Sequence, residues 1–228
     1  MYWDSTYILV VIGAIISLIA SANVKSTFSR YSKASYSCGI TGREAAERIL
    51  LGAGIRDVRV EMVAGSLSDH YSPREKVLRL SESVYHSDSA AAIGVAAHEC
   101  GHAIQHQVGY GPLKLRSLSV PIANFGSYLS LPIVILGIAL GRSTLAQVGV
   151  FLFTFVVLFQ LITLPVEFNA SRRAMKALEA GDMLQGEMLT GAGKVLRAAA
   201  LTYVAALFSA VLQLLRLVLL ARGGRRRD

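Results

Sequence analysis

The chain has 228 residues, a mean hydropathy of +0.49 and a hydrophobic content of 53%, which is high for a soluble protein. Its formal net charge is +8, but the basic residues flank apolar runs, and no aromatic-interleaved basic patch accompanies them. Lysine and arginine in such positions are explained by membrane topology and anionic lipid, so we reject nucleic acid as a partner. The two cysteines, Cys38 and Cys100, form no CxxC pair and suggest neither a disulfide framework nor a cysteine-based metal site.

Four apolar runs without charged residues occur along the chain. A membrane span needs roughly 17–25 predominantly apolar residues, and the two middle runs are too long and too close together for a soluble core of this size. The sequence therefore predicts a multi-pass protein of the cell membrane, with the lipid bilayer as one of its partners. The runs are Tyr7–Ala22, Leu118–Leu140, Leu145–Val166 and Ala198–Leu215.

Basic residues indicate how the spans are oriented. Lys25, Arg30 and Lys33 follow the first run, whereas no basic residue precedes it, which favours an uncleaved anchor over a signal peptide. The segment after this anchor is therefore expected on the cytosolic side. Four spans place the cluster Arg222–Arg227 outside, and Arg216 leaves open whether the last helix crosses fully.

The segment between the first two spans predicts a small soluble unit. Thr41 and Glu44 form a capping-box pattern that opens a helix running to about Leu51. Alternating apolar residues over Val58–Val63 and Lys76–Leu80, joined by a turn-rich loop, predict a small β-hairpin.

An alanine-rich helix follows, capped by Ser87 or Ser89 and ended near Gly109. His98 and His102 lie four residues apart on one face of this helix, with Glu99 beside them, which is the HExxH pattern. Its chemistry is two imidazoles on zinc and a carboxylate that acts as the general base toward water. The alternative is a packing helix with incidental histidines.

Catalytic zinc takes three protein ligands, and the chain offers two candidates for the third. His106 would lie about 12 Å from His98 along an unbroken helix, so both rings can hardly reach one ion. Glu167 follows the third apolar run, and two crossings separate it from HExxH, so it returns to the same side of the membrane. We therefore favour Glu167, on a helix expected to open at Pro165. The alternative role for Glu167 is an acid that interacts with the helix dipole.

Five segments together resemble the bacterial YugP-type neutral zinc metallopeptidases, which are membrane-embedded and more distantly similar to the HtpX-type and CAAX prenyl proteases. They are DHYSP (69–73), KVLRLSESVY (76–85), AAHECGHAIQHQ (96–107), PVEFNASRRA (165–174) and AAALTYVAAL (198–207). The resemblance implies one zinc ion per chain held by His98, His102 and Glu167, with Glu99 as general base. Ser171 stands where the distant relatives have an aspartate, so its contact to a ligand histidine is expected to be weaker than theirs or absent, although its hydroxyl could still accept a hydrogen bond.

Substrate contacts are expected before the HExxH helix, because gluzincins bind extended peptides along an exposed strand edge. An ordinary edge blunted by two charged side chains is the alternative for this strand. Tyr71 and His70, in the preceding loop, are candidates to donate to the oxyanion, or else they hold the turn. The expected edge comprises Lys76, Val77, Leu78, Arg79 and Leu80.

Taken together, the sequence predicts a mainly α, multi-pass membrane protein with a gluzincin-like zinc catalytic unit that contains a small β-hairpin. We expect a zinc metalloendopeptidase that cleaves protein or peptide substrates on the cytosolic side. The alternative is a catalytically silent membrane protein with a structural zinc site, and the sequence gives no oligomeric state. The expected segments are 1–24 (anchor), 25–117 (catalytic segment), 118–164 (transmembrane hairpin), 165–197 (helical segment with the third ligand) and 198–228 (last span and basic tail).

Overall fold

The computed structural model describes residues 5–33, 36–65 and 68–223. The described chain divides into two compact units. One comprises residues from 1–21, 114–165 and 201–228, and the other comprises 22–113 and 166–200. The end of the predicted basic tail, 224–228, lies outside the described residues.

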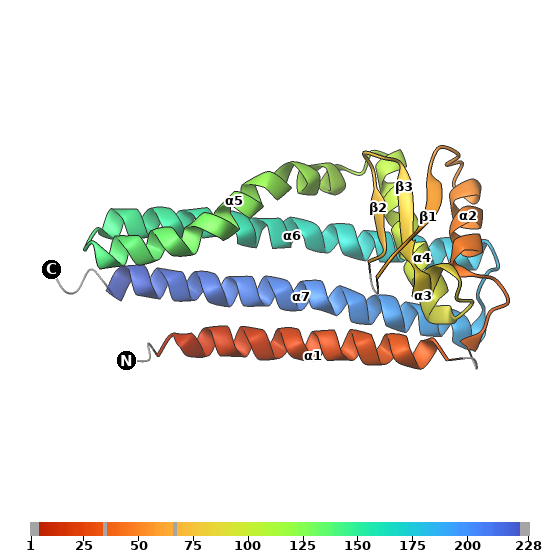
Figure 1. Ribbon diagram of the computed structural model, residues 1–228, viewed down its shortest axis with the longest axis horizontal. Coiled ribbons are helices and arrows are strands. Elements are labelled where there is room, and N and C mark those ends of the chain that lie inside the picture. Colours follow the sequence, from red (N-terminus) through yellow and green to blue (C-terminus); the bar gives the residue numbers. More distant parts are fainter. Residues whose placement is uncertain (1–4, 34–35, 66–67, 224–228) are drawn as a thin grey trace. The chain divides into compact units, whose positions relative to one another are not determined.

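Four helices are long and apolar enough to cross a membrane, and their most apolar 18-residue windows have mean hydropathies of 1.7–2.3. Only 11–28% of each window is buried within the protein, so most of these apolar side chains need lipid around them. The predicted mainly α fold class with four apolar helices is confirmed. The helices are α1 (Tyr7–Tyr31), α5 (Gly111–Ala139), α6 (Ser143–Ala180) and α7 (Gly186–Gly223) (Figure 1).

Small residues mediate helix packing inside the apolar unit. The Ser209 hydroxyl of α7 donates to the carbonyl oxygen of Gly13 in α1 over 2.9 Å and lies 3.0 Å from the Ser17 hydroxyl. A Cβ added at Gly149 of α6 would lie 2.6 Å from the carbonyl oxygen of Ser130 in α5. Close backbone approach at glycine and serine is typical of helices that associate in lipid, where apolar burial gives no driving force.

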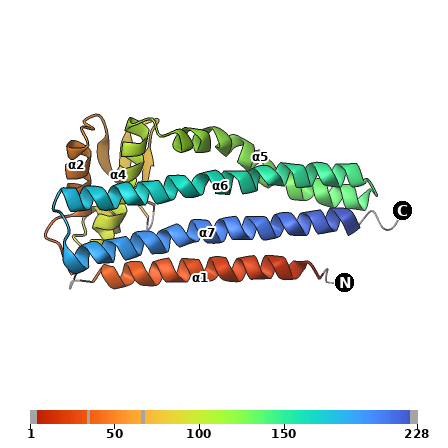
Figure 2. The same cartoon turned by 180° about the vertical axis from the view of Figure 1, so that it is seen from behind.

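Pro165 does not open a new helix. Helix α6 runs through it from Ser143 to Ala180 and is a continuous ribbon in both views (Figures 1 and 2). A proline removes one backbone hydrogen bond, but a long apolar helix tolerates this loss when its neighbours hold it in place. The third apolar run and Glu167 therefore belong to a single helix.

The two predicted helices of the other unit are confirmed. Helix α2 (Gly42–Gly52) starts with the predicted capping box, in which the Thr41 hydroxyl accepts from the Glu44 amide and the Glu44 carboxylate accepts from the Thr41 amide. Helix α4 (Ala90–Gln107) is capped by the hydroxyl of Ser89. Its chain leaves the helix at Gly109, whose φ of +65° suits glycine.

The small sheet has three strands, β1 (Arg59–Val63), β2 (His70–Ser72) and β3 (Val77–Ser81), in the order β1-β3-β2. The predicted hairpin partners are wrong, because β1 pairs with β3 in parallel and β2 forms the antiparallel hairpin with β3. The chain from Ser72 to Val77 is short enough for a tight turn, and β2 thereby occupies the position beside β3. Strand β2 was not predicted because its three residues are too few to show an alternating pattern.

Strand β3 is consequently the central strand and not an exposed edge, which corrects the expectation for 76–80. Both of its backbone edges pair with neighbouring strands, and Leu78 and Leu80 are fully buried. Lys76 lies before the strand in a left-handed turn with φ 53° and bridges to Asp57 over 2.5 Å. The outer edges of the sheet are formed by β1 and β2.

Helix α4 is held in place by a core built from small side chains. Four residues on one face of the helix are fully buried and pack with residues of α2, β3 and the last part of α6. They are Ile93, Ala96, Ala97 and Cys100. The short helix α3 (Glu82–Tyr85) joins β3 to this region. Burial of one face fixes the rotation of α4, so its histidines point away from this core in a defined direction.

Candidate metal centre

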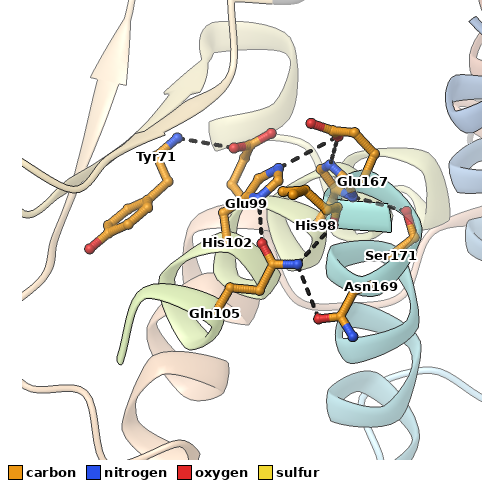
Figure 3. Close-up of polar contacts among 9 residues, drawn as sticks. Tyr71, His98, Glu99, His102, Gln105, Glu167, Asn169 and Ser171 are labelled. Carbon is orange, nitrogen blue, oxygen red and sulfur yellow. Dashed lines mark hydrogen bonds and ion pairs between the residues drawn. The ribbon is translucent and has the colours of Figure 1, made fainter. Parts of the chain in front are cut away.

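Three potential metal ligands converge from two helices. His98 and His102 come from α4 and Glu167 from α6, and their ligand atoms all lie within 4.8 Å of one another. The Glu167 Oε2 atom lies 3.2 Å from His98 Nε2 and 3.6 Å from His102 Nε2 (Figure 3). Glu167 is only 2% exposed, so its carboxylate is directed into the protein towards the two rings.

Gly101, inside the HExxH motif, explains how the helices approach so closely. A Cβ at this position would lie 2.4 Å from the carbonyl oxygen of Ala170 in α6, closer than real Cβ atoms come. Any side chain here would therefore push α4 away from α6. The glycine is needed for close backbone approach, and this approach brings Glu167 within reach of the histidines.

The carboxylate and the histidines influence each other's charge. Burial by itself raises the pKa of the Glu167 carboxyl, but hydrogen bonds and charge interactions with His102 and His98 outweigh it and hold the pKa well below its usual value. Burial lowers the pKa of His102, but Glu167 and Glu99 more than offset this effect, so its pKa is raised. The lowered pKa favours the ionised Glu167 carboxylate that metal binding requires, and a metal ion that binds here would displace a proton from protonated His102.

Each histidine uses its other ring nitrogen to bind a neighbouring side chain. His98 Nδ1 lies 3.1 Å from the Ser171 hydroxyl, and His102 Nδ1 lies 3.0 Å from Oε1 of Gln105. When Nδ1 carries the proton and donates it, Nε2 keeps a free lone pair, and both Nε2 atoms face Glu167. The contact considered from sequence for Ser171 is thus present in the structure, with a hydroxyl where the distant relatives have a carboxylate.

Glu99 lies beside the three ligands and is held by the backbone of β2. Glu99 as a whole is 9% exposed, and its Oε2 accepts a hydrogen bond from the Tyr71 amide over 3.0 Å (Figure 3). Because this N–H points away from β3, the outer edge of β2 faces α4 at the position of Glu99.

Comparisons with known proteins show which family the chain belongs to. A family model described as "Putative neutral zinc metallopeptidase" matches residues 6–222. The chain belongs to this family. A curated protein of Bacillus subtilis (strain 168), described as "Putative membrane protease YugP", is 47% identical over 220 residues, which cover 96% of this chain and 98% of that protein. No solved structure matches the chain. The resemblance stated from the sequence motifs is confirmed.

Membership of this zinc metallopeptidase family implies zinc, and the donor set fits that ion. Two imidazole nitrogens and a carboxylate oxygen are a ligand set that catalytic zinc sites use. Tetrahedral bonds of about 2.0–2.1 Å separate ligand atoms by about 3.3 Å. The distances of 3.2 Å and 3.6 Å from Glu167 Oε2 to the histidine nitrogens lie on either side of that value.

The other sequence candidates lie outside this group of three potential ligands. The His106 ring is near the end of α4, where its Nδ1 lies 2.9 Å from the Tyr71 hydroxyl. That hydroxyl is therefore directed to His106, and only the backbone amide of Tyr71 reaches Glu99. The exposed His70 side chain contacts the carbonyl oxygen of Ser68 in its own loop. His106 thus contacts the strand that holds Glu99.

Sequence reasoning missed Gln105, although a usable signal exists. Gln105 is three residues after His102, so both side chains lie on the same side of the helix. In the structure it is fully buried, whereas the next two polar residues, His106 and Gln107, are exposed. A buried amide must find hydrogen-bond partners, which makes such a position a candidate neighbour of the ligand.

Proposed function

We propose that this chain is a zinc-dependent endopeptidase of the gluzincin type that hydrolyses peptide bonds in proteins or peptides. His98, His102 and Glu167 would bind one zinc ion per chain, and Glu99 would act as the general base. The convergence of the two α4 histidines with the buried Glu167 of α6 carries the proposal. Membership of the metallopeptidase family supports it independently.

When bound, the zinc ion supplies a positive charge that polarises the scissile carbonyl and lowers the pKa of water. Glu99 accepts a proton from the attacking water and returns it to the leaving amine. The Tyr71 amide holds Glu99 Oε2 and so fixes the direction in which the other oxygen can act. A purely structural metal site has no use for a base held in this way, which disfavours the catalytically silent alternative.

We further propose that the substrate pairs with the outer edge of β2, in place of the central strand β3. An extended peptide can add to an open strand edge through main-chain hydrogen bonds, with little dependence on its sequence. Because the Tyr71 amide already donates to Glu99, a peptide on this edge would pair through the carbonyl oxygen of Tyr71 and not through its amide, and it would pass beside the base. A contact of His70 with the oxyanion stays a prediction, and in the structure its Nδ1 contacts the carbonyl oxygen of Ser68 in its own loop.

The test of the proposed function is metal removal. We expect purified full-length protein in detergent to contain about one zinc per chain and to cleave an unfolded casein-type substrate. A strong chelator should abolish cleavage, and added zinc should restore it. Stoichiometric zinc without cleavage of any unfolded substrate would instead favour the structural zinc site.

The proposed side of the membrane can be tested separately. We propose a multi-pass protein of the cell membrane with its active site on the cytosolic side, because basic residues concentrate beside the catalytic segments. Cysteine is introduced at the exposed Arg74 in a chain where Cys38 and Cys100 are replaced by serine and alanine. A membrane-impermeant thiol reagent should label Arg74→Cys only after lysis. Labelling in intact cells would reverse the orientation and leave the chemistry unchanged.

A further inference from the structure

Gln105 is the most completely buried polar side chain near the candidate metal centre. It is 0% exposed, and both ends of its amide have partners. Oε1 lies 3.0 Å from His102 Nδ1, and Nε2 donates to the Val166 carbonyl over 2.8 Å and to Asn169 Oδ1 over 3.0 Å (Figure 3). These contacts connect α4 to α6 at the metal centre.

The chemistry of the partners fixes which way the Gln105 amide faces. A backbone carbonyl such as that of Val166 can only accept a hydrogen bond. The Asn169 oxygen also accepts, because Arg173 Nε, which can only donate, points at it over 2.8 Å. The NH₂ group of Gln105 must therefore face α6, and its oxygen must face His102.

This orientation determines the state of His102. Because the amide oxygen of Gln105 is an acceptor, His102 Nδ1 must carry the proton in that contact. A neutral ring with its proton on Nδ1 has a free lone pair on Nε2, the atom that faces Glu167. Gln105 thus sets the tautomer of His102 that is suited to metal binding, although its own side chain lies on the other side of the ring from Glu167.

The same side chain also holds the backbone of the third ligand. The Val166 carbonyl that accepts from Gln105 belongs to the peptide bond whose nitrogen is that of Glu167. One buried amide therefore fixes the ring of one ligand from α4 and the main chain of another from α6. Ser171 has a more limited role, because its hydroxyl contacts the ring of one ligand, His98.

We propose that Gln105 is a positioning residue of the metal centre that selects the metal-binding tautomer of His102 and fixes the Glu167 backbone relative to it. This inference rests on the proposed zinc site. Residues that orient metal ligands typically change metal affinity by about 10–100-fold when they are lost.

The test compares two glutamines of the same helix in the full-length protein. Gln105→Met keeps a similar volume but removes both the acceptor and the donors, whereas Gln107→Met alters an exposed residue at the end of α4. Zinc affinity is measured by competition with a chromophoric chelator, and the visible spectrum of the Co²⁺-loaded protein reports ligand geometry. We expect Gln105→Met to bind zinc about 10–100-fold more weakly and to change the Co²⁺ spectrum, and Gln107→Met to match the wild type.

Two further variants keep the test decisive. In Gln105→Glu, burial favours the neutral acid, which retains an acceptor for His102 and one donor, so its zinc affinity should exceed that of Gln105→Met. If methionine at 105 prevents folding, Gln105→Asn replaces it, because the shorter amide cannot reach His102 and Val166 together. Its zinc affinity is then expected to fall in the same way.

Zinc binding by the wild-type protein is measured first, so that failure of the proposed function can be distinguished from failure of the positioning role. A wild-type protein that binds no zinc would overturn the proposed function and this inference with it. A folded Gln105→Met, or Gln105→Asn in its place, that binds zinc as tightly as the wild type would overturn only the positioning role. The same holds if Gln105→Glu binds zinc no better than Gln105→Met.

Discussion

Replacing Glu99 by glutamine should leave zinc bound and reduce peptide hydrolysis by about 10²–10⁴-fold, the usual contribution of a general base. An amide can still accept the hydrogen bond from the Tyr71 N–H that the carboxylate accepts over 3.0 Å, so the local structure should persist. It cannot take a proton from water. Zinc content, by metal analysis, and initial rates of casein cleavage are measured on the same preparation.

Glu82→Gln is the matched control, because Glu82 is an exposed glutamate at the start of α3 and outside the candidate site. It should retain both zinc and activity. Wild-type hydrolysis by Glu99→Gln would contradict the assignment of the base, whatever the zinc content. Loss of zinc from Glu99→Gln would show that Glu99 contributes to metal binding and would contradict the three-ligand site.

Replacing Glu167 by alanine should remove zinc or weaken its binding severely, because two histidines alone leave the ion short of protein ligands. The loss should exceed the roughly 10–100-fold expected for residues that only orient ligands. Glu167 is 2% exposed and is the α6 residue whose carboxylate lies 3.2 Å from His98 Nε2. Zinc stoichiometry and affinity of the purified variant measure the effect.

His106→Ala provides the comparison, since it removes the other residue that the sequence offers as a third ligand. Its ring contacts the Tyr71 hydroxyl, so the variant should keep its zinc. Loss of that contact is expected to lower the rate of hydrolysis. It would loosen β2, and the Tyr71 amide of this strand donates to Glu99. An empty His106→Ala together with a fully loaded Glu167→Ala would exclude the gluzincin assignment.

Helix α4 and the proximity of Glu167 to its histidines could be predicted from sequence, the first from a local pattern and the second from the order of the apolar runs. The HExxH spacing places His98 and His102 on one face of any helix that contains them. Two apolar runs between HExxH and Glu167, each long enough to cross a membrane, predict that the chain returns to one side, independently of how the helices pack. The structure brings these three residues within 4.8 Å of one another.

The sheet and the helix boundary at Pro165 could not be predicted in the same way. Strand β2 has three residues, and its place beside β3 follows from the turn that joins them, which alternation does not encode. Pro165 favours a helix start only where no longer helix is stabilised on both sides of it. The turn decided the first case, and the stability of the longer helix decided the second.

The contacts that complete the site depend on geometry that a sequence does not carry. The group that holds Glu99 is the backbone amide of Tyr71, and every residue except proline has one. Gln105 carried a signal in its spacing from His102, but its partners Val166 and Asn169 are about sixty residues away. The close approach of α4 to α6 at Gly101 brings Gln105 and these two partners together.

X-ray absorption at the zinc edge of the purified, zinc-loaded protein tests the metal centre most directly. With one zinc per chain, we expect scattering from two imidazole rings and a carboxylate, with oxygen and nitrogen ligands at about 2.0–2.2 Å. The imidazole contribution should be unchanged in His106→Ala. A sulfur ligand at about 2.3 Å, or a third imidazole that disappears in His106→Ala, would contradict a zinc site formed by His98, His102 and Glu167.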